Sequence, residues 1–448
     1  MMFSMLNAIR LVSRWEWLIL LGLMPLFLFP DGARGLIVFV IPLFWVGRKL
    51  STGHFFPATP FNLALLLMVI MIGLSSFLAF DLSLHLPKII GLVFGLALFL
   101  AVCEFSRQQS LWPVVIVFGG LGFLIALIGF AGMAWLPPFD SFNRVRMALP
   151  VPSLSVPGAV GGVINANELA GVLNWIAPLL LACSIGLSRR LWRVNKLALA
   201  FLILTTIIVS LLLIGTQSRG GIFAYGLGAA LVVAFFLPPR WRIVLMIALG
   251  IGLFGLITYF RNSTIQIDLV GDTLGLSGRL EIWSRALLAI ADYPLTGVGI
   301  NGFRQVVNTL YPLFGISEEI DLGHAHNHLF QVALDLGLPG LISYLSLWLI
   351  GGGLLWQTAR NLARRHAQHH PYYAMVAGLA GSLVAGWVFG IFDAVALGAR
   401  PSFIWWLLLG LTASVHYAVV YSGEQLRVHR WSVTRRRSTV REIRAGES

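Results

Sequence analysis

Long apolar runs separated by short polar connections dominate this chain. A run of about 20 mostly apolar residues is long enough to cross a lipid bilayer as a helix. We identify twelve such segments, at 16–30, 35–47, 61–80, 86–104, 111–136, 167–187, 196–215, 221–238, 242–260, 328–357, 372–394 and 401–421. The pattern predicts an all-α polytopic membrane protein with about twelve transmembrane helices.

The first two segments are the weakest of the twelve. Arg34 and Arg48 bracket the second one, which is short for a membrane span. These segments could be tilted spans whose arginines snorkel to the interface, or a re-entrant pair.

Two connections are longer than the rest. One, at 137–166, is rich in Pro and Gly, and the other, at 261–325, is the only long hydrophilic insertion. The sequence therefore predicts four regions, namely a membrane domain, an extramembrane loop, a second membrane domain and a basic tail: 1–260, 261–325, 326–421 and 422–448.

Composition supports this organisation. Hydrophobic residues make up 58% of the chain and charged residues 11%, against roughly 25% charged residues in a soluble domain. These figures exclude a soluble globular protein, a disordered chain and a fibrous repeat. Cys103 and Cys183 both fall inside predicted spans, so we expect neither a disulfide nor a metal site from them.

The net charge of +13 is mostly a signal of topology. About two thirds of the 31 Lys and Arg residues lie on one side if the N-terminus is cytoplasmic. The positive-inside rule then places both termini in the cytoplasm and the 261–325 loop outside. For the basic tail, an anionic lipid leaflet is a plainer partner than nucleic acid. We interpret the hydrophobic N-terminus as an uncleaved first span.

A cluster of histidines stands at the junction of the long loop and the tenth segment. His324, His326 and His328 lie within five residues, and His328, Gln331 and Asp335 would share one helix face. Histidine can accept a proton near neutral pH. A hydrated helix start would explain the cluster equally well. Alternating histidines can also bind metal, but no acidic or Cys cluster accompanies them in the sequence, so we expect no metal.

Two arginines lie on the predicted outer side, against the topological bias. Arg219 follows Thr216-Gln217-Ser218, and Arg279 lies in the predicted amphipathic helix around Trp283. The planar guanidinium suits a diphosphate. A snorkelling arginine at 219 and nonspecific binding of lipid headgroups at 279 are the simpler alternatives. That amphipathic helix would lie flat on the membrane surface with one apolar face, formed by Leu280, Trp283, Leu287 and Ile290.

Two further stretches have a plain structural explanation. Gly297–Gly302 matches GxGxxG but lacks a βαβ context, so we interpret it as a turn. Asn167 and Glu168 open the sixth segment, where a helix cap is at least as plausible as a catalytic role.

Together these stretches resemble the bacterial O-antigen ligase and O-antigen polymerase family. Four matches carry the resemblance: Asn165–Ala170 to its Asn-x-Asn segment, Thr216–Gly220 to its Ser-Arg segment, Gly278–Trp283 to its Gly-Arg-x-x-x-Trp segment, and His326–Gly337 to its His-Asn-x9-Gly motif. They occur in the family's order around one long outer loop, from about residue 160 to residue 400.

The resemblance implies a glycosyltransferase similar in architecture to the C-type glycosyltransferases. Such an enzyme transfers a glycan from an undecaprenyl diphosphate carrier to an acceptor, on the outer face of the inner membrane. Arg219 and Arg279 would hold the donor diphosphate, and His326 would act as general base or position the acceptor hydroxyl. Transfer would invert configuration and need no metal, cofactor or nucleotide sugar. Other residues expected to contact the substrate are His324, Asn327, His328, Asn167 and Glu168.

The family's ligase pattern is incomplete here. Gly337 precedes Leu338-Pro339-Gly340 rather than the Gly-x-x-Thr-Thr typical of ligases, and Phe223 stands where ligases carry Leu. A ligase to lipid A-core, a ligase to another acceptor such as protein, and a polymerase of repeat units therefore stay open. The competing class is a twelve-span transporter of sugars or anions, which would bind its substrate near the bilayer midplane.

Overall fold

The computed structural model describes residues 9–30, 32–77, 82–148, 164–262, 275–317, 322–395 and 397–421. Among these residues every regular element is a helix, apart from one bridge between Met133 and Ile164. The predicted tail (422–448), half of the 137–166 connection and parts of the 261–325 loop fall outside the described residues.

The described helices follow one another in an order close to that of the predicted segments. They are α2 (Glu16–Gly22), α3 (Met24–Leu28), the 3-10 helix η1 (Gly32–Phe39), α4 (Val40–Thr52), α5 (Asn62–Phe77), α6 (Leu82–Gln108), α7 (Trp112–Gly132), α8 (Ser141–Ala148), α9 (Ala166–Val194), α10 (Lys196–Gly215), α11 (Arg219–Phe236), α12 (Pro239–Asn262), α13 (Gly275–Asp292), α14 (Phe303–Leu310), α15 (His328–Arg364), α16 (Pro371–Phe392), the 3-10 helix η3 (Arg400–Ser402) and α17 (Phe403–Val420).

Nine helices within the described ranges are long and apolar enough to cross a membrane. They coincide with nine of the twelve predicted segments, and they confirm a multi-pass membrane architecture. Of the other three segments, 61–80 contains the shorter α5 and 242–260 lies in α12. The segment 16–30 is not one continuous helix, because it is divided at Leu23 into α2 and α3.

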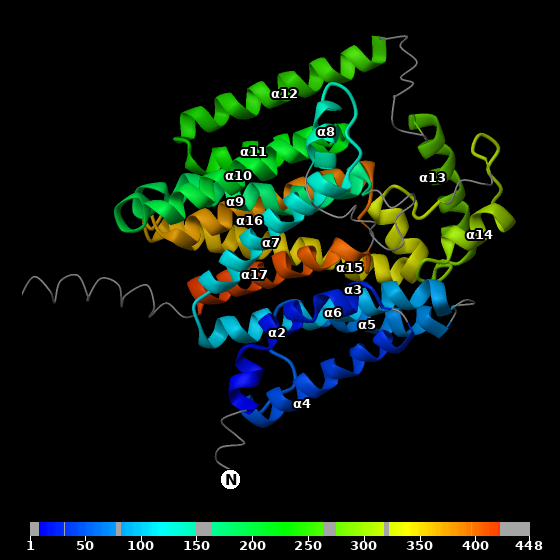
Figure 1. Cartoon of the computed structure of the whole chain (residues 1–448), viewed down its shortest axis with the longest axis horizontal. Helices are drawn as coiled ribbons and strands as arrows, with labels where there is room; N and C mark the ends of the chain where they lie inside the picture. Colours follow the sequence, from blue (N-terminus) through cyan, green and yellow to red (C-terminus); the bar gives the residue numbers. More distant parts are fainter. Residues whose placement is uncertain are drawn as a thin grey trace, which may run out of the picture.

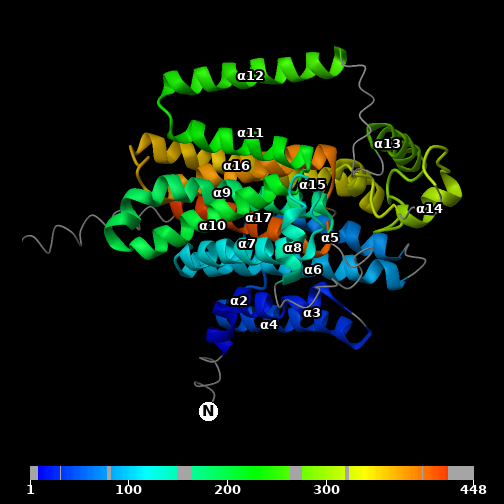
Figure 2. The ribbon, with the colours of Figure 1, turned by 45° about the horizontal axis from the view of Figure 1, so that its top comes forward.

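The helices form a bundle whose long axes run side by side (Figure 1). Helix α16 packs most extensively on α9 and α11, and α17 packs on α6. Helices α12 and α4 lie at opposite edges of the bundle in both views (Figure 2). The core is strongly apolar and aromatic, and Trp405 and Trp406 of α17 are almost fully buried within it.

Two helices of the long loop, α13 and α14, project from one end of the bundle (Figure 1). We call this end the loop end. Ile282, Ala286 and Ala289 of α13 pack with Phe303 and Val307 of α14 in a small apolar core of their own. The face that α13 buries against α14 is thus distinct from the apolar face that the sequence predicted to lie on the membrane surface. Of the predicted apolar face, Trp283 and Ile290 are partly buried, whereas Leu280 and Leu287 are exposed.

The α13–α14 unit docks on α15 through a break in that helix. Gly337 interrupts α15 with a φ of 68° and a ψ of −178°, a conformation that favours glycine. A Cβ at this position would lie 2.4 Å from the Leu295 carbonyl oxygen, and the Leu338 amide donates to the Pro294 carbonyl at 2.7 Å. The glycine of the His-Asn-x9-Gly motif thus lets the loop backbone approach the membrane helix.

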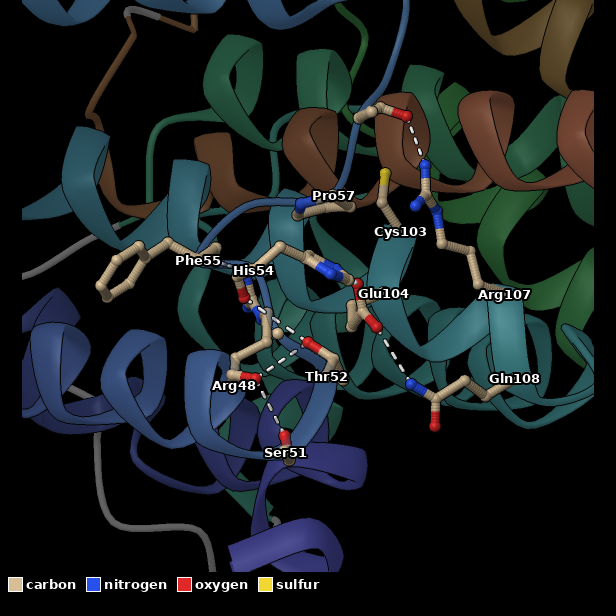
Figure 3. Close-up of polar contacts among 12 residues, drawn as sticks. Arg48, Ser51, Thr52, His54, Phe55, Pro57, Cys103, Glu104, Arg107 and Gln108 are labelled. Carbon is tan, nitrogen blue, oxygen red and sulfur yellow. Dashed lines mark hydrogen bonds and ion pairs between the residues drawn. The ribbon is translucent and has the colours of Figure 1, made fainter.

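Polar contacts join the first helices to α6 at the opposite end of the bundle (Figure 3). His54 lies 2.9 Å from a carboxylate oxygen of Glu104 on α6, and Gln108 donates to the other Glu104 oxygen at 3.0 Å. Arg48 donates to both carboxylate oxygens of Glu16 at 2.7 Å, and this pair is almost fully buried. Arg48 is therefore a partner in a buried ion pair and not a snorkelling residue.

Candidate active site

Four helix ends meet at the loop end of the bundle. Helices α9, α11 and α15 begin there, and α16 ends there. The Asn327 amide, at the cap of α15, donates to the Ile391 carbonyl in α16 at 3.1 Å. The rings of Phe223 in α11 and Phe392 in α16 lie 6.2 Å apart. Asp393, the C-cap of α16, therefore lies where these helix ends converge.

His326 is held by two partners at this junction. Its ring atom Nδ1 lies 3.1 Å from Oδ1 of Asp393, and its backbone N–H donates to Nδ1 of His324 at 3.1 Å. The second contact fixes a tight turn in which His326 has a φ of 48°. Because a carboxylate only accepts hydrogen bonds, we assign the ring proton to Nδ1. The lone pair of Nε2 is then available to a substrate.

The electrostatics favour a carboxylate at 393 and a neutral imidazole at 324. Burial alone would raise the pKa of Asp393, but the hydrogen bond from His326, the two neighbouring imidazoles and the positive charge of Arg279 lower it to about 2. Burial lowers the pKa of His324 to about 4. Near neutral pH, Asp393 can therefore orient His326, and His324 can accept the backbone hydrogen bond.

Arg279 lies beside this histidine–aspartate cluster. Its positive charge contributes to the lowered pKa values of both Asp393 and His324. Four residues later on the same helix face, the indole N–H of Trp283 donates to the Ala325 carbonyl at 3.0 Å. The Gly-Arg-x-x-x-Trp spacing thus fastens α13 to the histidine segment and brings the arginine to it.

Arg219 lies at the same end of the bundle but does not join the cluster. It is the exposed first residue of α11, and it is not among the charged groups that shift the pKa of Asp393 or of His324. Ser218 caps the helix by accepting from the Gly221 amide at 3.2 Å. The structure therefore brings together one of the two predicted arginines with the histidines and leaves the other solvent-accessible nearby.

Two predicted substrate contacts already have protein partners. The side chain of Asn327 caps α15 by accepting from the amides of Leu329 and Phe330, at 2.9 and 3.2 Å. His328 is buried with its Nδ1 2.9 Å from the hydroxyl of Tyr344. The ring of His328 also packs edge-on against Trp387. These contacts fix the start of α15, directly after His326.

Asn167 and Glu168 occupy the first turn of α9. The stretch Asn165–Glu168 forms the helix cap that the sequence offered as one interpretation: Asn165 accepts from the backbone amides of Asn167 and Glu168 at 2.8 and 3.2 Å. Glu168 interacts electrostatically with Arg400 and with Asp393. The acidic residue thus faces the same junction, with Arg400 as an opposite charge that acts on it.

The predicted polar stripe on α15 faces protein neighbours. Gln331 accepts from the Ala325 amide at 2.8 Å and donates to Asp335 at 2.9 Å. The same Asp335 oxygen accepts from the Asn301 amide at 2.9 Å.

The glycine-rich stretch Gly297–Gly302 is a turn, as predicted. Gly297, Gly299 and Asn301 all have positive φ angles. Through Asn301, this turn docks on the polar stripe of α15. The hydrogen bond from the Ala325 N–H to the Gln331 side chain links this stripe to the histidine segment.

Sequence reasoning missed Asp393 and Arg400. Both flank the short connection between α16 and η3, at the end of an otherwise apolar helix pair. Their charge at the edge of two membrane segments was the available signal. It could not reveal which histidine Asp393 meets, because 67 residues separate Asp393 from His326.

Comparison with known protein families adds independent evidence. Residues 204–345 match the family model described as O-antigen ligase. The matched segment runs from α10 into α15, about a third of the chain, and it contains three of the four motifs. It confirms the resemblance that the motifs predicted. No curated protein matches the chain.

The O-antigen ligase match and the apolar helices agree with each other. Together they identify a multi-pass membrane protein and support an enzymatic role in glycan transfer during O-antigen assembly. The match includes Arg219, Arg279 and His326, but it ends before Asp393.

Proposed function

We propose that this protein transfers a glycan from an undecaprenyl diphosphate carrier to an acceptor hydroxyl at the periplasmic face of the bacterial inner membrane. The observation that carries the proposal is the pairing of His326 with Asp393 beside Arg279. This arrangement combines a base, a group that orients the base and a fixed cation. Glycan transfer with an anionic leaving group needs a base for the acceptor hydroxyl and positive charge for the leaving group.

In the proposed reaction, Nε2 of His326 takes the proton of the acceptor hydroxyl as its oxygen attacks the anomeric carbon. The bond between that carbon and the diphosphate breaks, and the electron pair leaves with undecaprenyl diphosphate. Asp393 stabilises the imidazolium that forms. Arg279 and Arg219 bind the leaving diphosphate, so no metal or nucleotide sugar is required. A single displacement inverts the anomeric configuration.

Other residues at the loop end would position the reactants. We assign His324 and Asn327 to holding His326, and His328 to anchoring the first turn of α15. Asn167 and Glu168 lie at the start of α9, where they can contact sugar hydroxyls of the donor or the acceptor.

Two substitutions test the site assignment. His326→Ala removes the base and should lower the transfer rate by about 10²–10⁴-fold. Arg279→Ala removes charge stabilisation and should lower it by about 10²–10³-fold. Glycan transfer is measured with membranes that contain equal amounts of each variant.

Arg285→Ala is the matched control for Arg279→Ala. Arg285 lies on the same helix, but it donates to the Pro312 carbonyl within the loop. Its replacement should leave the rate within about twofold of the wild type. Full activity of both site variants would refute the assignment.

The ligase and polymerase hypotheses predict different cellular glycans when the gene is deleted. Loss of a polymerase leaves single repeat units on their acceptor, whereas loss of a ligase leaves long polymer on the lipid carrier. Electrophoresis of the cell's glycans distinguishes these patterns. Unchanged glycans would contradict both hypotheses.

A further inference from the structure

The histidine–aspartate cluster has a second chemical property besides proton transfer. His324, His326 and Asp393 each present one ligand atom, and all three atoms lie within 4.8 Å of one another. Within the described residues no other group of His, Cys, Asp and Glu meets this condition. Two imidazoles and one carboxylate form a donor set that suits zinc and neighbouring divalent transition metals.

The distances are close to those of a metal site. Ligand atoms around a tetrahedral zinc ion are roughly 3.3 Å apart, given metal–ligand bonds of about 2.0 Å. Here Oδ1 of Asp393 lies 3.1 Å from Nδ1 of His326 and 3.8 Å from Nδ1 of His324. The third pair, one nitrogen from each histidine, lies within 4.8 Å, so side-chain rotations would have to draw the two nitrogens together around the ion.

The cluster is accessible and in a suitable protonation state. The side chains of His324 and His326 are 29% and 19% exposed, so an ion can reach them from solvent. Metal ligands must be deprotonated. Nδ1 of His324 accepts a hydrogen bond from the His326 N–H, so this nitrogen presents a lone pair.

We propose that His324, His326 and Asp393 bind one divalent transition metal ion, and that its binding inhibits the enzyme. The ion takes the place of two hydrogen bonds, the one between His326 and Asp393 and the one that Nδ1 of His324 accepts from the His326 N–H. Three protein ligands leave a fourth position for water, as in open zinc sites.

The inhibition follows from the chemistry of imidazole, and it rests on the proposed function. A metal on Nδ1 of His326 leaves the ring proton on Nε2. That nitrogen then has no lone pair with which to take the proton of an acceptor hydroxyl.

Binding is tested on the purified full-length protein in a neutral detergent, with an affinity tag that contains no histidine. Titration with zinc chloride in a calorimeter should give one ion per chain. His324→Ala and Asp393→Ala should each weaken binding by at least about tenfold, because even indirect partners of a metal are worth 10–100-fold.

Two variants control for zinc binding by other histidines and for loss of binding through misfolding. The double variant His369→Ala/His370→Ala removes one exposed and one partly buried histidine at the other end of the bundle, and it should retain the affinity. His324→Cys exchanges one ligand for another, so it should bind zinc and, with cobalt, show a thiolate charge-transfer absorption band. Melting temperatures verify that all variants are folded.

Several results would overturn the proposal. These are no zinc binding by the wild type, unchanged binding by His324→Ala, or loss of binding only in the His369/His370 variant. Inhibition of glycan transfer by zinc is measured separately. If the protein transfers no glycan but binds zinc as described, the proposed function fails and the metal site stands.

Discussion

His326, the proposed base, has a left-handed backbone conformation that its neighbours must hold in place. A φ of 48° is unfavourable for a non-glycine residue by roughly 1–2 kcal/mol. The hydrogen bonds to His324 and Asp393 offset this cost, and they aim the ring. Such strain persists only where the surroundings enforce it. The geometry of His326 therefore depends on its two partners.

Replacing Asp393 by Asn should lower the transfer rate by about 10²–10⁴-fold at an unchanged protein level. The amide has nearly the same shape, but it can offer a donor to Nδ1 and stabilises an imidazolium poorly. The rate is measured with the lipid-linked donor. Asp140→Asn makes the same chemical change at an exposed aspartate and should be neutral. An Asp393→Asn enzyme with the wild-type rate would contradict the role.

The turn at His324 should tolerate Asn better than Ala. The amide oxygen of Asn can accept from the N–H two residues later, as Nδ1 of His324 does. We expect His324→Asn to retain most of the activity and His324→Ala to lose it by about tenfold or more, since a misplaced base is costly. Equal rates in both variants would show that the turn does not position His326.

Acidification should destabilise the protein in part through His324. Its pKa lies at about 4 instead of the usual 6.5, so the unfolded chain takes up the proton first as the pH falls. The stabilisation is therefore complete above pH 6.5 and is lost between about 6.5 and 4. The melting temperature of His324→Asn should fall less over this range than that of the wild type. An identical decline in both proteins would refute this contribution.

At the scale of elements, apolar length predicts helices more reliably than it predicts their continuity. Segment 16–30 is apolar enough for a span, yet it breaks at Leu23, and segment 328–357, predicted as one span, is interrupted at Gly337. Local composition sets the tendency to be helical. The breaks depend on what packs against each helix, as Gly337 shows.

Replacing Gly337 by Ala should destabilise the docking of α13 and α14 on α15. The positive φ and the approach of the Leu295 carbonyl leave no room for a Cβ, so we expect a loss above about 1 kcal/mol. Thermal unfolding and limited proteolysis of the loop measure it.

Gly352→Ala is the matched control in the same helix. A Cβ at Gly352 meets no atom within 4 Å, and alanine favours a helix over glycine by about 1 kcal/mol. Its stability should be unchanged or higher. A similar loss in both variants would show that the break at Gly337 carries no special constraint.

At the scale of the whole molecule, the charge pattern and the helix order agree on one topology. The loop end would face the periplasm, and the end that carries the α15–α16 connection would face the cytoplasm. This orientation is a prediction from the distribution of Lys and Arg.

Cysteine labelling tests this orientation. The native Cys103 and Cys183 are buried, so they should react little. A membrane-impermeant maleimide should label Ser284→Cys, on an exposed position of α13, in cells whose outer membrane is permeable. Gln368→Cys, in the exposed connection before α16, should react only after the inner membrane is opened. The reverse pattern would invert the topology.

The sequence by itself determined the membrane class, most of the helices and the identity of Arg219, Arg279 and His326 as candidates. Those features are local, because apolar length, charge excess and short motifs each depend on residues that are close together in the sequence. The tertiary structure alone decided that Asp393 meets His326, that His328 turns inward towards Tyr344, and that Arg48 pairs with Glu16. These contacts join distant segments, and they depend on how packed helices align their ends.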